Sequence, residues 1–263
     1  MITYWDIDEV FLAYTPLDQF EIKEFISIYW FLFVNIKMSL TNIGLYLIIS
    51  VWLIFTISVL TSNNNKILPN KWSIWQESMY QTIHNIIINQ IDKKKGEIFF
   101  FFMFFLFNFI LINNIFGMIP YSFASTSHFF LTFTLSFTIV IGATILGFKK
   151  YGFRFFSLLV PAGCPLGLLP LLVLIELISY LSRNVSLGLR LAANILSGHM
   201  LLNILSGFTY NMINSNSFYI LVSILPLIFV ILFSGLELGI AFIQSQVFVV
   251  LSCSYIKDSL ELH

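Results

Sequence analysis

Full charges are scarce in this sequence. Charged residues make up 10% and hydrophobic residues 58% of the 263 residues. A soluble globular domain carries about 25% charged residues, so the composition excludes that class and indicates a polytopic membrane protein. The net charge is zero, so no excess of basic residues is present to bind nucleic acid.

Motifs for catalysis and for metal or cofactor binding are also missing. The sequence contains no G-x-x-x-x-G-K-[ST] phosphate loop, no metal-ligand cluster and no nucleophile–base signature. The two cysteines, Cys164 and Cys253, match no metal or redox spacing, and we interpret them as inert thiols in apolar helices. We therefore predict no cofactor and no catalytic site in this chain.

The first residues, MITYWDIDEV, lack the basic region of a secretory signal and the arginines of a transit peptide. Phenylalanine is abundant, with 30 residues, as are Ile and Asn, while Ala and Arg are scarce. This bias is typical of an AT-rich genome, and organelle genomes are often AT-rich. A hydrophobic mitochondrial protein without a transit peptide would be made inside the organelle, and we expect that origin.

Apolar runs predict an all-α polytopic protein with about five membrane-crossing helices, since about 20 apolar residues span a bilayer. The expected helices are residues 39–60, 98–119, 128–148, 165–206 and 217–256. The last two exceed one upright crossing and are joined by a short loop, SGFTYNMINSNS, so we expect a long, strongly tilted or bent hairpin. For residues 1–38 we expect a loop with a short surface helix on the outer side of the membrane.

Residues 72–95 predict one amphipathic helix that lies in the membrane interface. Its apolar residues recur at spacings of three and four: Trp72, Trp75, Met79, Ile83, Ile86, Ile87 and Ile91.

Basic residues of the whole chain fall on one side of a five-crossing topology: Lys66, Lys71, Lys93, Lys94, Lys95, Lys149, Lys150, Arg154 and Lys257. The positive-inside rule then predicts an outer N-terminus and an inner C-terminus, on the cytoplasmic or matrix side.

Between Arg154 and Lys257 the only full charges are Glu176, Arg183, Arg190 and Glu237. An arginine keeps its proton at any accessible pH, and burying one at a bilayer centre costs roughly 2.5–3.5 kcal/mol or more. Steps of seven residues place Glu176, Arg183 and Arg190 close to one helix face. Such residues in lipid indicate a protein that moves charge.

Other polar residues extend this pattern. Asn194 lies one turn from Arg190, and His199 lies on the opposite face of the same helix. Glu237 and Gln244 are seven residues apart and share a face of the next helix. In an antiparallel hairpin His199 and Glu237 lie nearer the turn, where they can meet as an acid–base pair suited to proton relay.

The arrangement predicts two half-channels that are separated by Arg190. One ends at the His199–Glu237 pair and the other at Glu176, about 21 Å from Arg190 along the helix. Small residues around Arg190 predict a groove for a partner helix that carries a mobile carboxylate: Gly188, Ala192, Ala193, Ser197 and Gly198.

Several alternatives stay open. The charges can instead form a buried salt bridge that fixes helix register. Arg183 is either a half-channel residue or an ion-pair partner of Glu176. Asn108, Asn113 and Asn114 either bond between helices or line the outer half-channel, and His128 is expected at the interface.

At SLGLRLAANILSGHMLLNIL the chain resembles subunit a of F-type ATP synthases in its mitochondrial, fungal-like form. Further matching segments are TPLDQFEI, NNNKILPNKWSIWQESMY, NIFGMIPYSF, VPAGCPLGLLPLLVLIELISY and LELGIAFIQSQVF. The resemblance implies that Arg190 is the essential arginine that faces the rotor ring, with Asn194 one turn on. It implies that His199 and Glu237 form the outer half-channel pair, that Glu176 serves the matrix half-channel, and that Gln244 lies opposite the arginine.

The same resemblance implies the surroundings of the protein. The expected location is the mitochondrial inner membrane, with the N-terminus toward the intermembrane space and the C-terminus toward the matrix. Expected partners are the subunit c ring, the peripheral stalk, small membrane subunits of the synthase and a second synthase in dimers. Alternatives from other classes are a secondary transporter or respiratory proton-pump subunit, which usually contains repeats not found here, and a purely structural subunit, which would not need Arg190.

Overall fold

A computed structural model describes residues 18–30, 36–61, 70–91, 93–119, 122–159, 166–215 and 217–260. Five of its helices are long and apolar enough to cross a membrane: Asn42–Thr61, Gly96–Gly117, Phe129–Phe156, Leu169–Ser215 and Leu221–Leu260. The prediction of an all-α polytopic membrane protein is confirmed. Cys164 and Lys66 lie outside the described residues, while Cys253 is a buried free thiol.

The N-terminal region differs from its prediction. Residues 1–17 lie outside the described part of the chain, and in the described part a single turn η1 (Asp18–Phe20) precedes two antiparallel strands, β1 (Glu24–Trp30) and β2 (Ile36–Thr41), where we expected no strand. The segment EFISIYW is rich in β-branched and aromatic residues, which favour an extended backbone.

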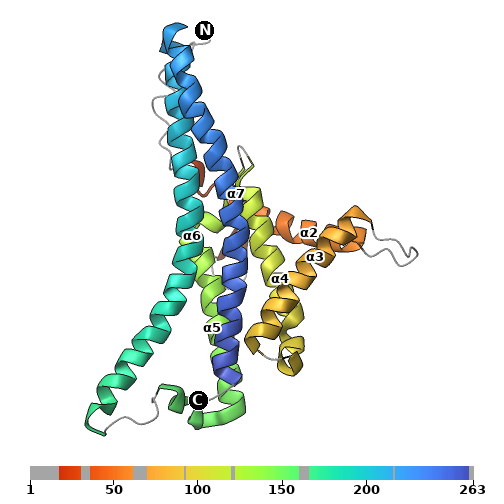
Figure 1. Cartoon of the computed structure of the whole chain (residues 1–263), viewed down its shortest axis with the longest axis vertical. Helices are drawn as coiled ribbons and strands as arrows, with labels where there is room; N and C mark the ends of the chain where they lie inside the picture. Colours follow the sequence, from red (N-terminus) through yellow and green to blue (C-terminus); the bar gives the residue numbers. More distant parts are fainter. Residues whose placement is uncertain are drawn as a thin grey trace.

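The first three described α-helices are α2 (Asn42–Thr61), α3 (Lys71–Ile91) and α4 (Lys93–Gly117). Figure 1 shows α2 and α3 projecting to one side of the other helices. Residues 93–95 begin α4 rather than ending the interfacial helix, whose described part ends at Ile91. On α3 the predicted apolar face is buried at Ile83, Ile87 and Ile91 against the other helices.

A short turn η2 (Ser125–Ser127) leads into α5 (Phe129–Tyr151), followed by η3 (Gly152–Leu159) and η4 (Leu166–Leu168). Then come the two longest helices, α6 (Leu169–Ser215) and α7 (Ser217–Leu260). Pro170 lies in the first turn of α6, where its missing N–H breaks no helical hydrogen bond.

The expected loop at 206–217 is wrong, because α6 continues to Ser215 and the connection to α7 is very short. Two hydroxyl side chains of this stretch form hydrogen bonds to backbone carbonyls of the same helix. Ser206 Oγ donates to the Asn203 carbonyl at 3.0 Å, and Thr209 Oγ1 donates to the Ser206 carbonyl at 2.6 Å. Gly207 costs a helix only about 1 kcal/mol, which is too little to end it.

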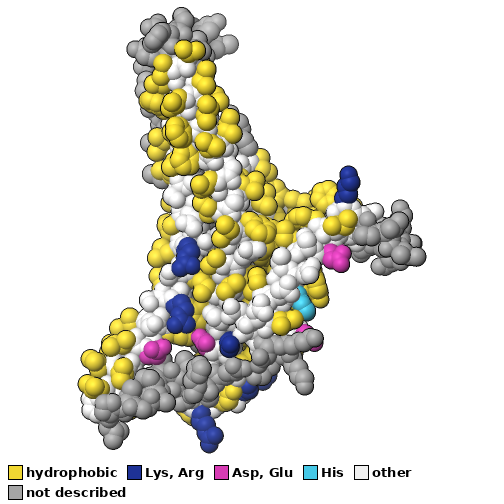
Figure 2. All heavy atoms as spheres, in the orientation of Figure 1, with side chains coloured by type: hydrophobic (Ala, Val, Ile, Leu, Met, Phe, Trp, Pro, Cys, Tyr) yellow, Lys and Arg dark blue, Asp and Glu magenta, His cyan; other side chains and the backbone are white. Residues whose placement is uncertain are grey.

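Helix α6 has 47 residues and is therefore about 70 Å long. Figure 1 shows that it runs beside α7 in an upper arm and diverges from α7 toward its own N-terminus. On the face in Figure 2 the described side chains of that arm are hydrophobic or uncharged, and the charged side chains lie lower or to the side.

One main core joins α3, α4, α5, α6 and α7. Its largest fully buried side chains include Phe107, Leu187, Leu191, Phe248 and Tyr255. A second, smaller cluster consists of Phe20, Ala124 and Ile195, packed against Leu196 and Met200. This second cluster lies where the N-terminal turn meets α6, beyond Arg190 toward the hairpin turn.

Replacing Gly188 with valine should separate α5 from α6. A Cβ at this position would lie 3.0 Å from Phe133 Cδ1, 3.0 Å from Ser136 Oγ and 3.3 Å from the Thr132 carbonyl oxygen of α5. We expect a loss of roughly 1–3 kcal/mol of stability, as for other overpacked interiors, measured as a lower thermal unfolding midpoint. Gly207→Val on the same helix is the control, since nothing lies within 4 Å there; equal losses in both variants would contradict the close-contact explanation.

Candidate functional site

Polar contacts join α6 to α7 along their shared length. In the order of α6, three that the described residues form are Arg183 Nη1–Asp258 Oδ2 at 3.5 Å, Asn194 Nδ2–Gln244 Oε1 at 3.3 Å and His199 Nε2–Glu237 Oε1 at 3.5 Å. Partner numbers rise along α6 as they fall along α7, which is an antiparallel register. In this register Arg190 lies level with the part of α7 between Gln244 and Asp258.

His199 and Glu237 lie together, as their helical spacing suggested. Their side chains are only 8% and 5% exposed. Neither His199 Nε2 nor either carboxylate oxygen of Glu237 has a hydrogen-bond partner among the described residues. Buried polar atoms without partners are costly, so the pair requires a proton, a water molecule or both. Because 3.5 Å exceeds the usual distance for direct proton transfer, a proton passes between this imidazole and this carboxyl group through a water molecule or after a small approach of the two side chains.

Two glycines make room for this pair. A Cβ on Gly198 would lie 2.8 Å from Glu237 Oε1, which is closer than real Cβ contacts allow. A Cβ on Gly117, at the end of α4, would lie 3.4 Å from His199 Nε2 and 3.1 Å from Ala124 Cβ. The absence of side chains at both positions therefore lets the acid and the base approach each other.

Toward the N-terminal end of α6 from this pair, Asn194 donates a hydrogen bond from Nδ2 to Gln244 Oε1. Gln244 is 4% exposed, and its Nε2 group has no partner among the described residues. The amide pair thus leaves one donor unsatisfied near the Arg190 region of the interface.

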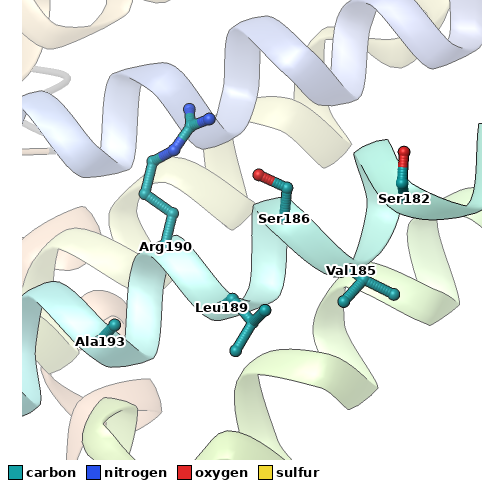
Figure 3. Close-up of a pocket in the computed structure, with 6 residues that line it drawn as sticks. All are labelled: Ser182, Val185, Ser186, Leu189, Arg190 and Ala193. Carbon is teal, nitrogen blue, oxygen red and sulfur yellow. The ribbon is translucent and has the colours of Figure 1, made fainter. Parts of the chain in front are cut away.

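Arg190 is exposed on a shallow pocket that one face of α6 forms alone (Figure 3). The lining residues are Ser182, Val185, Ser186, Leu189, Arg190 and Ala193. Apart from Arg190 they are small or aliphatic. Because the guanidinium cannot lose its proton, this surface offers a permanent positive charge to whatever covers it.

The predicted groove of small residues is only partly correct. Ala193 and Ser197 are exposed beside Arg190, but Gly188 and Ala192 are buried, and Gly198 is directed toward Glu237. Three of the five small residues therefore serve packing inside this chain. A helical spacing cannot tell which small residues face a neighbouring helix of the same chain.

Arg183 pairs with Asp258, not with Glu176 as one alternative proposed. Its guanidinium carbon also lies 6.0 Å from the centre of the Tyr255 ring. Glu176 lies one seven-residue step further on, past the level of Asp258 and close to the end of α7, and is partly exposed. Asp258 was missed, although the seven-residue spacing from Glu237 through Gln244 leads to it.

A second polar group lies between α4 and η2. Asn113 Oδ1 accepts a hydrogen bond from Ser125 Oγ at 3.0 Å, and Asn114 Nδ2 donates to the Ala241 carbonyl of α7 at 3.4 Å. These contacts support the interpretation that both asparagines join elements together. The buried atoms Asn114 Oδ1 and Thr126 Oγ1 have no partner among the described residues, so this region is polar as well as buried.

Asn108 and His128 contact residues close to them in the sequence. Asn108 Nδ2 donates to the Phe104 carbonyl of its own helix at 2.9 Å. His128 precedes α5, and its ring stacks on Phe123 with a centroid distance of 5.1 Å. Burial lowers the pKa of His128 below its ordinary value, so this imidazole is largely neutral at neutral pH.

Within the described segments, no group of three or more His, Cys, Asp or Glu side chains is placed to hold a metal ion. The arrangement instead combines a buried acid–base pair, a fixed cation on a free surface and a carboxylate beyond it. The acid–base pair and the carboxylate can take up and release protons, whereas the guanidinium of Arg190 keeps its proton.

Comparisons with known proteins agree with one another. The sequence model of the family described as "ATP synthase A chain" matches residues 44–257. A protein of Podospora anserina named "ATP synthase subunit a" is 65% identical over 249 residues, covering 95% of this chain and 94% of that protein. Proteins with the same name from Cochliobolus heterostrophus and Mycosarcoma maydis are 69% identical over 249 residues and 44% identical over 253 residues. They cover 95% and 96% of this chain, and 97% and 99% of their own lengths.

Replacing Gly198 with alanine should move the Glu237 carboxyl group away from His199, because the added Cβ would lie 2.8 Å from Oε1. A high-resolution structure of the variant measures the Oε1–Nε2 distance, which we expect to exceed the present 3.5 Å. Gly207→Ala, on the same helix with open space around it, should leave that distance unchanged. An unaltered pair in the Gly198 variant would show that the glycine does not determine its geometry.

Proposed function

Since this chain belongs to the ATP synthase A chain family, whose members are proton-translocating membrane subunits, we propose that α6 and α7 form two offset aqueous half-channels separated by Arg190. The chain is a multi-pass protein of the mitochondrial inner membrane, associated with other membrane subunits of the synthase. The observation that carries the proposal is the exposed Arg190 on a free face of α6, between buried acid–base groups and a carboxylate.

The outer half-channel ends at His199 and Glu237. Unpartnered polar atoms on Asn114 and Thr126 support a polar route to this pair from the region between α4 and η2. Water in this route would satisfy buried groups that have no protein partner. A proton that reaches the pair can pass from imidazole to carboxyl without crossing a fully apolar region.

A rotor helix covers the Arg190 face in this proposal. The pocket there is shallow and lined by small and aliphatic side chains, which suits the close approach of another helix. The partner is the subunit c ring, whose helices carry a carboxyl group. A deprotonated carboxylate of the ring pairs with Arg190, whereas a free proton is repelled by it. Protons therefore cross only while they are bound to carboxyl groups of the rotating ring.

The inner half-channel includes Glu176, and its opening lies at the end of α7 near the Arg183–Asp258 ion pair. Basic residues near this end include Lys149, Lys150 and Lys257. By the positive-inside rule this end faces the matrix, and the α6–α7 turn faces the intermembrane space. Asn194 and Gln244 hold the two helices together beside the arginine.

This role needs no catalytic group in the chain. Moving one elementary charge across 100 mV releases about 2.3 kcal/mol, which the ring converts into rotation. ATP is then formed by other subunits of the complex. Contacts with the peripheral stalk, with small membrane subunits and with a second synthase in dimers are further parts of the proposal.

Replacing Arg190 with alanine in the assembled complex should abolish ATP-driven proton pumping while leaving assembly intact. Arg190→Lys should rescue little, because an ammonium group can lose its proton and lacks the planar fork of guanidinium. Proton pumping is measured in inverted inner-membrane vesicles, and Arg154→Ala, at an exposed position outside α6 and α7, is the control. Unchanged coupled pumping in the Arg190 variant would refute the proposal. Co-purification with a ring of acidic helices separates it from a secondary transporter.

Exchanging the outer pair tests whether acid and base act together. Glu237→His alone and His199→Glu alone should each slow proton pumping by roughly 10²-fold or more, the usual scale for loss of a general acid or base. The double exchange restores one acid and one base at the same separation and should recover part of the rate. If the double variant is no faster than either single variant, the two residues do not work as a pair.

A further inference from the structure

The N-terminal turn η1 makes a specific contact with the outer half of α6. Gln19 Oε1 accepts a hydrogen bond from Asn203 Nδ2 at 2.6 Å. Phe20 is 9% exposed, although the side chains of the following residues 21–27 are all exposed. The turn is therefore held by two side chains, not by general burial of the segment.

Phe20 is placed against His199. The centres of the two rings lie 6.4 Å apart at an interplanar angle of 64°, which is an edge-to-face contact. Phe20 also packs with Ala124 and Ile195 in the small core cluster. Asn203, which binds the neighbouring Gln19, lies one helical turn beyond His199 on α6. The hydrogen bond and the ring contact thus act on the same stretch of helix.

Described residues of three other elements lie near His199. Glu237 approaches from α7, and the Gly117 backbone from α4. Phe20 contributes the third contact, from a part of the chain outside the helical bundle. Among the described groups on these elements that approach His199, Glu237 is the charged one.

Nothing on the described bundle fixes the imidazole by hydrogen bonding at Nε2. That atom is buried, lies 3.5 Å from Glu237 Oε1 and has no hydrogen-bond partner. An imidazole without such a bond can rotate unless other atoms restrict it. Edge-to-face aromatic contacts have a preferred geometry, so Phe20 supplies the missing restriction.

We propose that Phe20, held in place by the Gln19–Asn203 hydrogen bond, is a positioning residue that keeps the His199 imidazole directed at Glu237. This inference rests on the proposed function of the His199–Glu237 pair. The apolar ring also closes the side of His199 that faces the N-terminal segment. Protons then reach the pair from the polar region between α4 and η2, where Asn114 and Thr126 have unpartnered atoms.

The test uses the full chain in the assembled complex, in inner-membrane vesicles. Phe20→Ala should leave assembly intact and slow proton transport by roughly two- to tenfold, the scale of one edge-to-face aromatic contact. Phe20→Tyr retains the ring and should restore most of the rate, while Phe20→Leu retains bulk alone and should not. Phe25→Ala is the matched control, since Phe25 belongs to the same segment but is 63% exposed.

Proton transport is measured against the proton concentration on the outer side, at a fixed driving force. A positioning residue changes how the rate depends on this concentration, because it affects proton uptake by His199. A residue that only anchors the N-terminal segment would change the number of assembled complexes and leave that dependence as it was. Gln19→Ala and Asn203→Ala should each shift the dependence in the same direction as Phe20→Ala, and their effects should not add in the double variant.

The outcomes separate this inference from the proposed function. If Phe20→Ala behaves like Phe25→Ala while Glu237→Gln stops transport, the positioning role is wrong and the half-channel proposal stands. If Phe20→Leu matches Phe20→Tyr, the bulk of residue 20 suffices and the edge-to-face argument fails. Normal transport in Glu237→Gln would instead overturn the proposed function itself.

Discussion

The antiparallel register of α6 and α7 sets the position of every charged group in the apolar half of the chain. Three polar contacts fix that register: Arg183 with Asp258, Asn194 with Gln244, and His199 with Glu237. In a bilayer, each of these side chains would be costly alone, so the register that pairs them is favoured over neighbouring registers. Arg190 falls between two of the contacts and pairs with neither carboxylate of α7.

The two faces of α6 have different surroundings. On the inner face Gly188, Leu187 and Leu191 pack against the rest of the bundle, and Gly188 allows a close approach by α5. On the opposite face small and aliphatic residues surround Arg190, and they line a shallow pocket formed by α6 alone among the described residues. His199 lies on the inner face, where α4, α7 and η1 enclose it. The buried His199 and the exposed Arg190 can therefore occupy one helix and remain separate.

The sequence predicted much of the helical arrangement and of the candidate site. Uncharged runs predicted the spanning helices, and the seven-residue spacing placed Glu176, Arg183 and Arg190 on one face. The meeting of His199 with Glu237 followed from their distances to the hairpin turn. The continuation of α6 to Ser215 did not, because hydrogen bonds from Ser and Thr side chains to the preceding turn are invisible in a hydropathy pattern. Asp258 continues the seven-residue spacing of Glu237 and Gln244, but that spacing alone does not show that Arg183 of the neighbouring helix lies opposite it.

The sequence by itself determined the class of the protein, the number of spanning helices and the residues that carry charge, because these depend on composition and on the helical period. The tertiary structure decided which partner each residue meets: Asp258 for Arg183, the bundle interior for Gly188, and Phe20 for His199. Contacts between residues far apart in the chain depend on how whole helices and the N-terminal turn pack together. The spacing of residues along one helix determines which of them share a face, but it does not determine which neighbouring element covers that face.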